Sequence, residues 1–465
     1  MTALSVGTGK SAVQTADAVR NGDVTAVDVV RRTIRSIQQH DPALNAVTDL
    51  YPDRALEDAA RVDDLVRRGE DPGPLAGVPF AVKNLFDVRG HRTRAGSIIE
   101  PDRGPAPADA TAVRRLRQSG AVVVAATNMD EYAHGFTTEN AHHGTTRNPR
   151  DTDRLAGGSS GGSAAVVAAG LVPLALGSDT NGSVRVPASL CGVFGLKPTF
   201  GTVSRAGTTL FVTSLDHIGL LASTAYDLAT AFDVLTGPDD RDPVSSPGAR
   251  RACLPTIGLG VDGLRLAMAG GHFTEVTDDE VMSAVEEALR PLDVRRTAEV
   301  PGSRQACGAS SLITSAEAGQ RHLARLRTRA PDYDRAVRPA LIAGALVPAA
   351  DYLAAQRFRR HYRDVVRTVF KDVDILITAT TPYSAPRVGE RFIRVRGEDL
   401  SIGANLGLLT QPWAFVGIPA LSVPIRGPGG LPVGLQLVGP PHAEASLFRV
   451  ARAIECAGST IGRST

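Results

Sequence analysis

Residues 157–201 read GGSSGGSAAVVAAGLVPLALGSDTNGSVRVPASLCGVFGLKPTFG, which is two glycine- and serine-rich turns separated by an apolar segment. The small apolar residues after the first turn predict a helix, and a buried strand ending at Gly177 follows it. Upstream, GVPFAVKN (77–84) and AVVVAATN (121–128) predict further buried strands, joined by a helix over 110–120. This alternation predicts an α/β fold in which helices flank a largely buried sheet.

The N-terminal part of the chain (1–70) is predicted to be helical. Apolar residues recur at helical spacing over 25–40, with Thr25 as the N-cap, and again over 51–69. These helices are expected to lie on the outside of the core.

A loop-like stretch over 238–256 ends the predicted catalytic core (71–237). It opens a helical insert, which reaches to about 370 and is expected to shape the pocket. The last part (371–465) returns to the core through a strand. No internal repeat interrupts the chain, so one domain over 1–465 is predicted.

Composition excludes several classes of protein. The chain has 465 residues, 43% of them hydrophobic, and a formal net charge of +2 without long basic runs. It therefore lacks the footprint of a nucleic-acid-binding protein, and no apolar run is long enough for a membrane span. Residues 1–10 lack an apolar signal core, and the four cysteines are too far apart for a disulfide framework or a metal cluster, so we expect a cytoplasmic protein. The cysteines are Cys191, Cys253, Cys307 and Cys456.

Lysine is rare. Of 51 basic residues only Lys10, Lys83, Lys197 and Lys371 are lysines. Unlike arginine, a buried lysine can lose its proton near neutral pH. Lys83 and Lys197 lie in apolar, strand-like segments, so either is a candidate base or a structural lysine.

The first glycine-serine turn has three possible roles. A linker is disfavoured because an apolar helix follows at once, and a phosphate-binding loop would need a GxxxxGK[ST] spacing that is absent. The turn matches twice the pattern GxSxG, which is typical of a nucleophile elbow. Such an elbow must directly follow a buried strand, however, and residues 147–156, which precede the turn, are polar. In the second turn, the amides of Thr180, Asn181, Gly182 and Ser183 could bind an oxyanion, or the turn could be an ordinary strand-to-loop connection.

These segments, in this order, resemble the amidase signature family of serine hydrolases. The resemblance extends through TNMDEYAHGFTTENAHHGTTRNP (127–149) and PWAFVGIPALSVPI (412–425), and is weakest over 240–370. It implies a single α/β domain with a large mixed central sheet and helices on both faces.

The resemblance also implies a Ser-cisSer-Lys triad. Lys83 is the expected base, Ser159 the bridging serine after a cis peptide bond, and Ser183 the nucleophile that forms an acyl-enzyme. The amides of residues 180–183 would then form the oxyanion hole. No metal or cofactor is expected.

Four side chains are expected to contact substrate, although a structural ion pair between Arg185 and Asp179 is the alternative for the arginine. They are Met129, Thr137, Asn181 and Arg185.

Asn84 and Asn181 depart from the commonest family pattern and favour a polar acyl group. The combination resembles the 1-carboxybiuret hydrolase branch, which implies hydrolysis of a small amide with release of ammonia. The alternatives are the glutamine-hydrolysing component of glutamyl-tRNA amidotransferase and an inactive scaffold. Both enzyme branches imply a small helical partner protein, and a homo-oligomer is possible. Direct contact with nucleic acid or a membrane is not expected.

Overall fold

The computed structural model describes residues 10–246 and 252–461. Most of the 1–10 segment and the middle of the 238–256 loop lie outside the described residues. Within them, the larger of two clusters of buried hydrophobic side chains runs from α1 (Ala12–Arg20) to α15 (Glu444–Cys456). None of the helices in these ranges combines the length and the apolar character that crossing a membrane requires.

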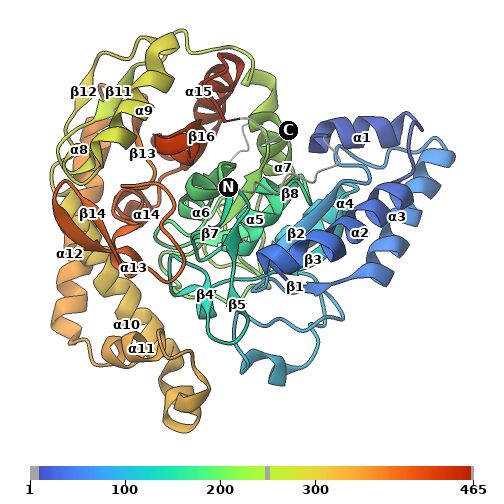
Figure 1. Cartoon of the computed structure of the whole chain (residues 1–465), viewed down its shortest axis with the longest axis horizontal. Helices are drawn as coiled ribbons and strands as arrows, with labels where there is room; N and C mark the ends of the chain where they lie inside the picture. The colour runs from blue at the N-terminus through green and yellow to red at the C-terminus, as the bar shows by residue number, and fades with distance from the viewer. Residues whose placement is uncertain (1–9, 247–251, 462–465) are drawn as a thin grey trace.

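A mixed sheet of 11 strands forms the centre of the described chain (Figure 1). The strand order is β1-β3-β2-β8-β10-β9-β16-β17-β13-β11-β12. The bounds are β1 (Val47–Leu50), β2 (Pro79–Lys83), β3 (Val122–Thr127), β8 (Leu174–Asp179), β9 (Phe194–Lys197), β10 (His217–Ala222), β11 (Leu266–Ala269), β12 (Thr297–Ala298), β13 (Ile375–Ala379), β16 (Ala420–Arg426) and β17 (Pro432–Val438).

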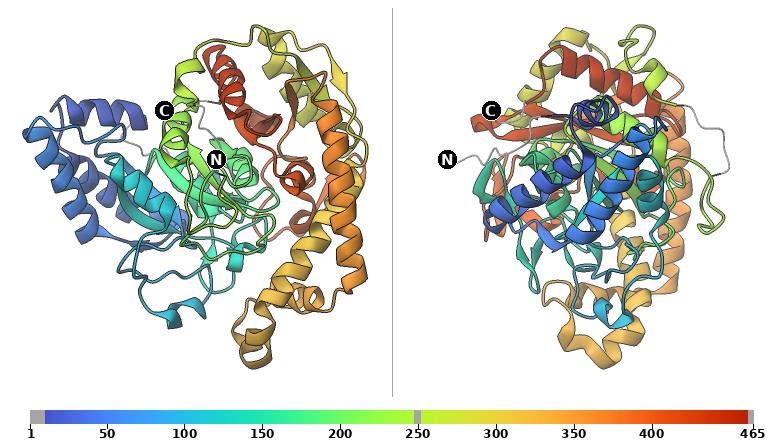
Figure 2. Two further views of the ribbon diagram at one scale, coloured as in Figure 1. Left: turned by 180° about the vertical axis from the view of Figure 1, so that it is seen from behind. Right: turned by 90° about the vertical axis from the view of Figure 1, so that its right-hand side faces the viewer.

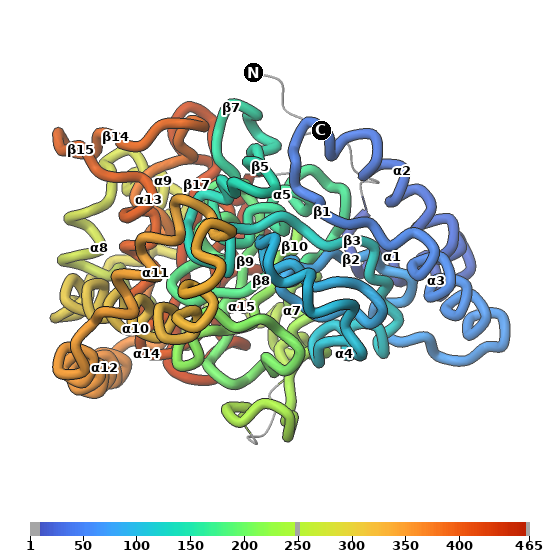
Figure 3. The backbone as a smooth tube through the Cα atoms, turned by 90° about the horizontal axis from the view of Figure 1, so that it is seen from below, coloured from blue at the N-terminus to red at the C-terminus, as the bar shows by residue number. Residues whose placement is uncertain are grey.

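Two groups of helices lie at opposite ends of the molecule, as Figures 1 and 3 both show. At one end are α1 (Ala12–Arg20), α2 (Ala26–Leu44) and α3 (Pro52–Arg67); at the other are α10 (Ser303–Arg329), α11 (Arg338–Ala345) and α12 (Ala349–Val369). The expected cap of α2 is present, since the Thr25 side chain accepts a hydrogen bond from Asp28 N. Figure 2 shows the α10–α12 group from behind and from the side.

The remaining elements cover the sheet or form small hairpins. The helices are α4 (Thr111–Gln118), α5 (Gly161–Ala168), α6 (Arg185–Cys191), α7 (Ala225–Leu235), α8 (His272–Glu275), α9 (Asp279–Leu289), α13 (Ile402–Asn405), α14 (Gln411–Val416) and α15 (Glu444–Cys456). The short strands are β4 (Glu139–Asn140), β5 (Gly144–Thr145), β6 (Arg147–Asn148), β7 (Asp151–Leu155), β14 (Phe392–Val395) and β15 (Glu398–Ser401).

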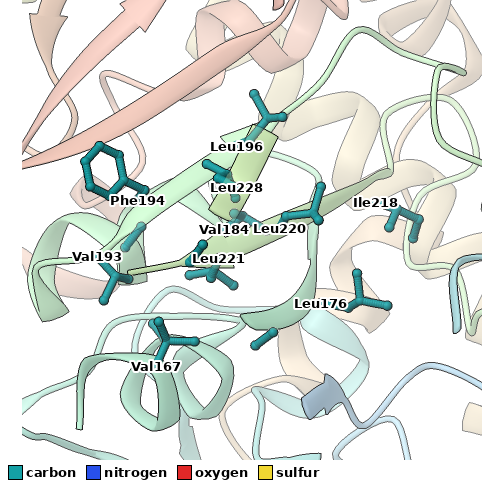
Figure 4. Packing of buried hydrophobic residues seen from close by; sticks show 14 of the residues in the cluster. Val167, Leu176, Val184, Val193, Phe194, Leu196, Ile218, Leu220, Leu221 and Leu228 are labelled. Carbon is teal, nitrogen blue, oxygen red and sulfur yellow. The ribbon is translucent and has the colours of Figure 1, made fainter. Parts of the chain in front are cut away.

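Every residue of β8, β9 and β10 is buried. Because side chains alternate between the two faces of a strand, both faces of this part of the sheet must be covered. Figure 4 shows the packing, with Val167 of α5 and Leu228 of α7 among the side chains around Leu176 and Leu220. The predicted α/β class is thus confirmed.

The structure corrects three details. The 238–370 insert is not purely helical, because β11 and β12 add parallel strands to one end of the central sheet. Strand β8 continues to Asp179 rather than ending at Gly177. Part of the polar 147–156 segment forms a two-stranded sheet, although it is not the buried strand that an elbow needs.

The topology also determines where the site lies. Strands β3, β2 and β8 are neighbours and parallel. Their carboxyl ends therefore meet at one edge of the sheet, the position where open α/β sheets bind ligands. Lys83, Thr127 and Asp179 are the last residues of these three strands.

Candidate active site

Lys83 ends β2 with a fully buried side chain. Its Nζ donates to Ser159 Oγ at 2.6 Å and to Ser178 Oγ at 2.9 Å. Burial lowers the pKa of Lys83 to about 7, although nearby carboxylates act in the opposite direction. Near neutral pH a large fraction of this amine is therefore uncharged and able to accept a proton.

Lys197, the other candidate, has different partners. It ends β9, is fully buried, and burial lowers its pKa to about 7 as well. However, its Nζ donates to two backbone carbonyls, Pro198 O at 3.1 Å and Ile418 O at 2.5 Å. Carbonyl oxygens have no proton to pass on, so this geometry is that of a structural lysine.

The first glycine-serine turn lies directly against the second. The peptide bond between Gly158 and Ser159 is cis, as expected from the resemblance. Ser160 N donates to Ser183 O at 3.1 Å, and Ser160 Oγ donates to Ser178 O at 3.2 Å. These bonds bring Ser159 and Ser183 into neighbouring segments.

The second turn carries Ser183, which is 3% exposed. Gly182 has φ +140°, and Thr410 Oγ1 donates to Asn181 O at 2.6 Å, which holds the turn from the C-terminal side. In the described part of the chain, the amides of residues 180–183 and the Ser183 hydroxyl have no hydrogen-bond acceptor. These donors are thus available to a ligand.

Arg185 follows the turn and is fully buried. Its Nη2 and Nε donate to the two carboxyl oxygens of Asp179 at 2.8 and 2.9 Å, and its Nη1 donates to Thr410 O and Gln436 Oε1. Burial alone would raise the pKa of Asp179, but the Arg185 charge holds it at about 2. Arg185 therefore forms the structural ion pair with Asp179 that was the alternative to substrate binding, and we do not propose it as a substrate ligand.

The Asn181 side chain contacts the insert. Its Nδ2 donates to Thr314 Oγ1 at 2.9 Å, and its Oδ1 accepts from Ser310 Oγ at 2.7 Å. Both partners belong to α10. Asn181 therefore links the Ser183 turn to helix α10 of the 238–370 segment.

The other predicted contacts differ in exposure. Met129 is fully buried, whereas Thr137 is half-buried and lies beside Gly158. Asn84, which departs from the commonest family pattern, has a side chain with partners of its own: its Nδ2 donates to Asp49 Oδ2 and its Oδ1 accepts from Arg94 N. Met129 and Thr137 stay predicted substrate contacts.

Two buried residues near Lys83 escaped the sequence analysis. Ser178 lies on β8, and only the sheet order places it opposite the end of β2. Asp130 follows β3 by three residues, and burial raises its pKa to about 7. The sequence signal that could have identified Asp130 is its position as an acidic residue just after a predicted buried strand. Across the described ranges, no group of three or more metal-ligating side chains is placed to hold a metal ion.

A comparison with protein-family models matches residues 28–448 to the family described as Amidase. The chain belongs to the amidase signature family. It is accordingly an amidohydrolase that acts on C–N bonds. The match includes the insert, where the sequence resemblance was weakest.

This amidase is similar to the following three proteins over nearly its whole length. It is 45% identical to AtzE, a component of the 1-carboxybiuret hydrolase of Pseudomonas sp. (strain ADP), covering 96% of this chain and 98% of the relative. It is 36% identical to the GatA-type component of the glutamyl-tRNA(Gln) amidotransferase of Carboxydothermus hydrogenoformans, covering 96% of both. A solved structure described as an unexpected vestigial protein complex that reveals the evolutionary origins of an s-triazine catabolic enzyme matches with TM-score 0.96 and 44% identity, covering 98% of this chain and 100% of that one.

Proposed function

We propose that this amidase hydrolyses a C–N bond of a small polar amide with Lys83 as the base, Ser159 as the proton relay and Ser183 as the nucleophile. The observation that carries the proposal is the 2.6 Å hydrogen bond between a fully buried lysine of lowered pKa and the Ser159 hydroxyl. A hydroxyl both donates and accepts, so Ser159 can transfer a proton in either direction.

The reaction begins when neutral Lys83 accepts the proton of Ser159 while Ser159 takes that of Ser183. Ser183 Oγ then bonds to the carbonyl carbon of the substrate, and the carbonyl oxygen becomes an oxyanion. The free amides of residues 180–183 would stabilise this charge, each worth about 2.7–4 kcal/mol of barrier.

The proton then returns through Ser159 to the leaving nitrogen. The C–N bond breaks, ammonia leaves, and the acyl group remains on Ser183. Water hydrolyses this acyl-enzyme: Ser159 and Lys83 take the proton of the attacking water and return one to Ser183 Oγ as the acid departs. Ser159 and Ser183 lie in touching segments, and catalytic hydrogen bonds often tighten only in the substrate complex.

We propose 1-carboxybiuret as the substrate. The 45% identity to a component of a 1-carboxybiuret hydrolase over almost the whole chain supports it. The test is ammonia release from 1-carboxybiuret, biuret and glutamine by wild type and by Ser183→Ala. Rapid release from 1-carboxybiuret by wild type alone is expected. Equal release by Ser183→Ala would refute the triad, whereas no release from any of the three compounds by wild type would favour an inactive scaffold.

Glutamine hydrolysis is the second candidate. Its support is the 36% identity to a component of an amidotransferase over 96% of the chain. Ammonia release from glutamine that greatly exceeds release from 1-carboxybiuret would establish this function and overturn the proposed substrate.

We also propose a small helical partner protein. A solved structure that matches nearly the whole chain is described as a protein complex. Addition of a candidate partner should increase ammonia release or the stability of this chain. We propose a cytoplasmic location because Cys191, Cys307 and Cys456 are free thiols.

A further inference from the structure

Asp130 is a buried carboxylate with an unpaired oxygen. The residue is 5% exposed, and its Oδ2 is fully enclosed without a hydrogen-bond partner among the described residues. An orphaned buried oxygen is unusual, because buried polar atoms are nearly always paired. The carboxylate therefore requires an explanation beyond packing.

Two glycines provide the space that this carboxylate occupies. A Cβ at Gly158 would lie 2.2 Å from Asp130 Oδ2, and a Cβ at Gly135 would lie 2.6 Å from Asp130 Cγ. Any larger residue at either position would displace the carboxylate. Asp130 Oδ2 is thus packed against the residue that precedes Ser159.

The other carboxyl oxygen acts on the same loop through Thr138. Asp130 Oδ1 accepts from Thr138 N at 2.9 Å. Thr138 Oγ1 in turn donates to Gly157 O at 2.9 Å and accepts from Gly161 N at 3.2 Å. Thr138 therefore bridges the two ends of the loop that carries Ser159.

The backbone between Asp130 and Thr138 is held in an uncommon conformation. Tyr132, Ala133 and Thr138 all have positive φ, at 50°, 63° and 54°. Positive φ is uncommon for residues other than glycine, and such backbone clusters at functional sites. The segment thus adopts a conformation that its own local preferences disfavour.

Asp130 also lies within the electrostatic reach of Lys83. Among the charges acting on Lys83, Asp130 has the largest effect in raising the pKa, ahead of Asp216 and Asp179. Asp179 is neutralised by Arg185. Asp216 accepts hydrogen bonds from Thr180 Oγ1 and two backbone amides.

The remaining charges that face Asp130 are acidic. Besides Lys83 they are Glu139 and Asp334, both of which raise the pKa of Asp130. Lys83 is the cation with the largest effect on the pKa of this carboxylate. Both residues are buried.

We propose that Asp130 is a positioning residue of the triad: through Thr138 it fixes the loop that carries Ser159, and its unpaired oxygen supplies a negative charge that acts on Lys83. This inference rests on the proposed catalytic roles of Lys83, Ser159 and Ser183. Burial raises the pKa of Asp130 to about 7, so Asp130 and Lys83 titrate as a coupled pair and the Asp130 charge acts on Lys83 from about neutral pH upward. There the charge keeps Lys83 a stronger base than burial alone would leave it.

The test measures how fast a fluorophosphonate labels Ser183 between pH 5 and 9, by mass spectrometry. The wild-type rate should rise with a midpoint near the Lys83 pKa of about 7. Asp130→Asn keeps an acceptor for Thr138 N but removes the charge. Loss of a negative charge disfavours protonated Lys83, so the midpoint should fall by about 1 pH unit.

The matched control is Asp41→Asn. Asp41 is a carboxylate that likewise accepts backbone amide hydrogen bonds, from Ala46 and Val47, and burial raises its pKa. It is not among the charges acting on Lys83. A midpoint unchanged in Asp130→Asn, or shifted equally in Asp41→Asn, would overturn the proposal. If Asp130→Asn does not fold, Asp130→Ala removes the same charge, and the pH midpoint of Ser183 labelling in Asp130→Ala tests the proposal in the same way.

Thr138→Val tests the positioning part. It removes the two hydroxyl bonds to the loop without changing any charge, so the plateau rate should fall about tenfold or more while the midpoint stays. A plateau labelling rate in Thr138→Val equal to that of wild type would refute the positioning role. If wild type is not labelled on Ser183 at any pH, the proposed function itself fails, and this inference fails with it.

Discussion

Lys83→Met is expected to abolish activity and yet make the folded protein more stable near neutral pH. In the unfolded chain a lysine stays charged up to its ordinary pKa of 10.5, whereas folded Lys83 is charged only below about 7. Between these values the unfolded state binds more protons, so wild-type stability rises with pH. Methionine has no such proton linkage.

The size of the effect follows from the two pKa values. At 1.36 kcal/mol per pKa unit, burial of Lys83 destabilises the fold by about 4 kcal/mol at pH 7 and by about 2 kcal/mol at pH 9. The stability advantage of Lys83→Met over wild type should therefore shrink by about 2 kcal/mol between these pH values. The lost bonds to Ser159 and Ser178 affect both measurements alike and cancel in this difference.

Urea unfolding, followed by the fluorescence of the single tryptophan, measures this difference. Trp413 is fully buried, so its emission should change on unfolding. Lys371→Met, at an exposed lysine, is the control and should show no pH-dependent advantage. A Lys83→Met advantage that is the same at pH 7 and pH 9 would refute the burial argument.

Two further predictions separate the site from its surroundings. Lys197→Met removes a lysine that donates only to carbonyls, so labelling of Ser183 should stay within about tenfold of wild type; a loss as deep as in Lys83→Met would contradict the assignment. Gly182→Ala places a Cβ 2.1 Å from Thr410 Oγ1 at φ +140°, so the turn must move and kcat should fall about 100-fold or more. Gly258→Ala, with open space around it, is the control, and wild-type kcat in Gly182→Ala would show that the turn tolerates a side chain.

Much of the fold could be predicted from local pattern. The apolar runs of β2 and β3 and the Thr25 cap carry strong signals and were recognised. Strands β11 and β12 carry weak sequence signals. β11 alternates between buried and half-buried residues over four positions, and β12 has only two residues. Such short strands exist because neighbours pair with them, and pairing is a tertiary property.

In the active site, too, some features follow from local sequence and others depend on tertiary contacts. The family motifs identify Lys83, Ser159 and Ser183, but lysine usage and local pattern alone cannot separate Lys83 from Lys197. Both end apolar strands and both are fully buried. Only their partners distinguish them, hydroxyls in one case and carbonyls in the other. Asp130 was missed because its proposed role depends on its packing against Gly158, which lies far away in the sequence.

Covalent labelling with site mapping shows whether Ser183 is the nucleophile and whether it depends on Lys83. The protein is treated with a fluorophosphonate, digested, and the modified peptide is sequenced by mass spectrometry. We expect one modified residue, Ser183, in wild type and no modification in Ser183→Ala or Lys83→Met. A label on a different serine, or a Ser183→Ala protein that still reacts and still releases ammonia, would contradict it.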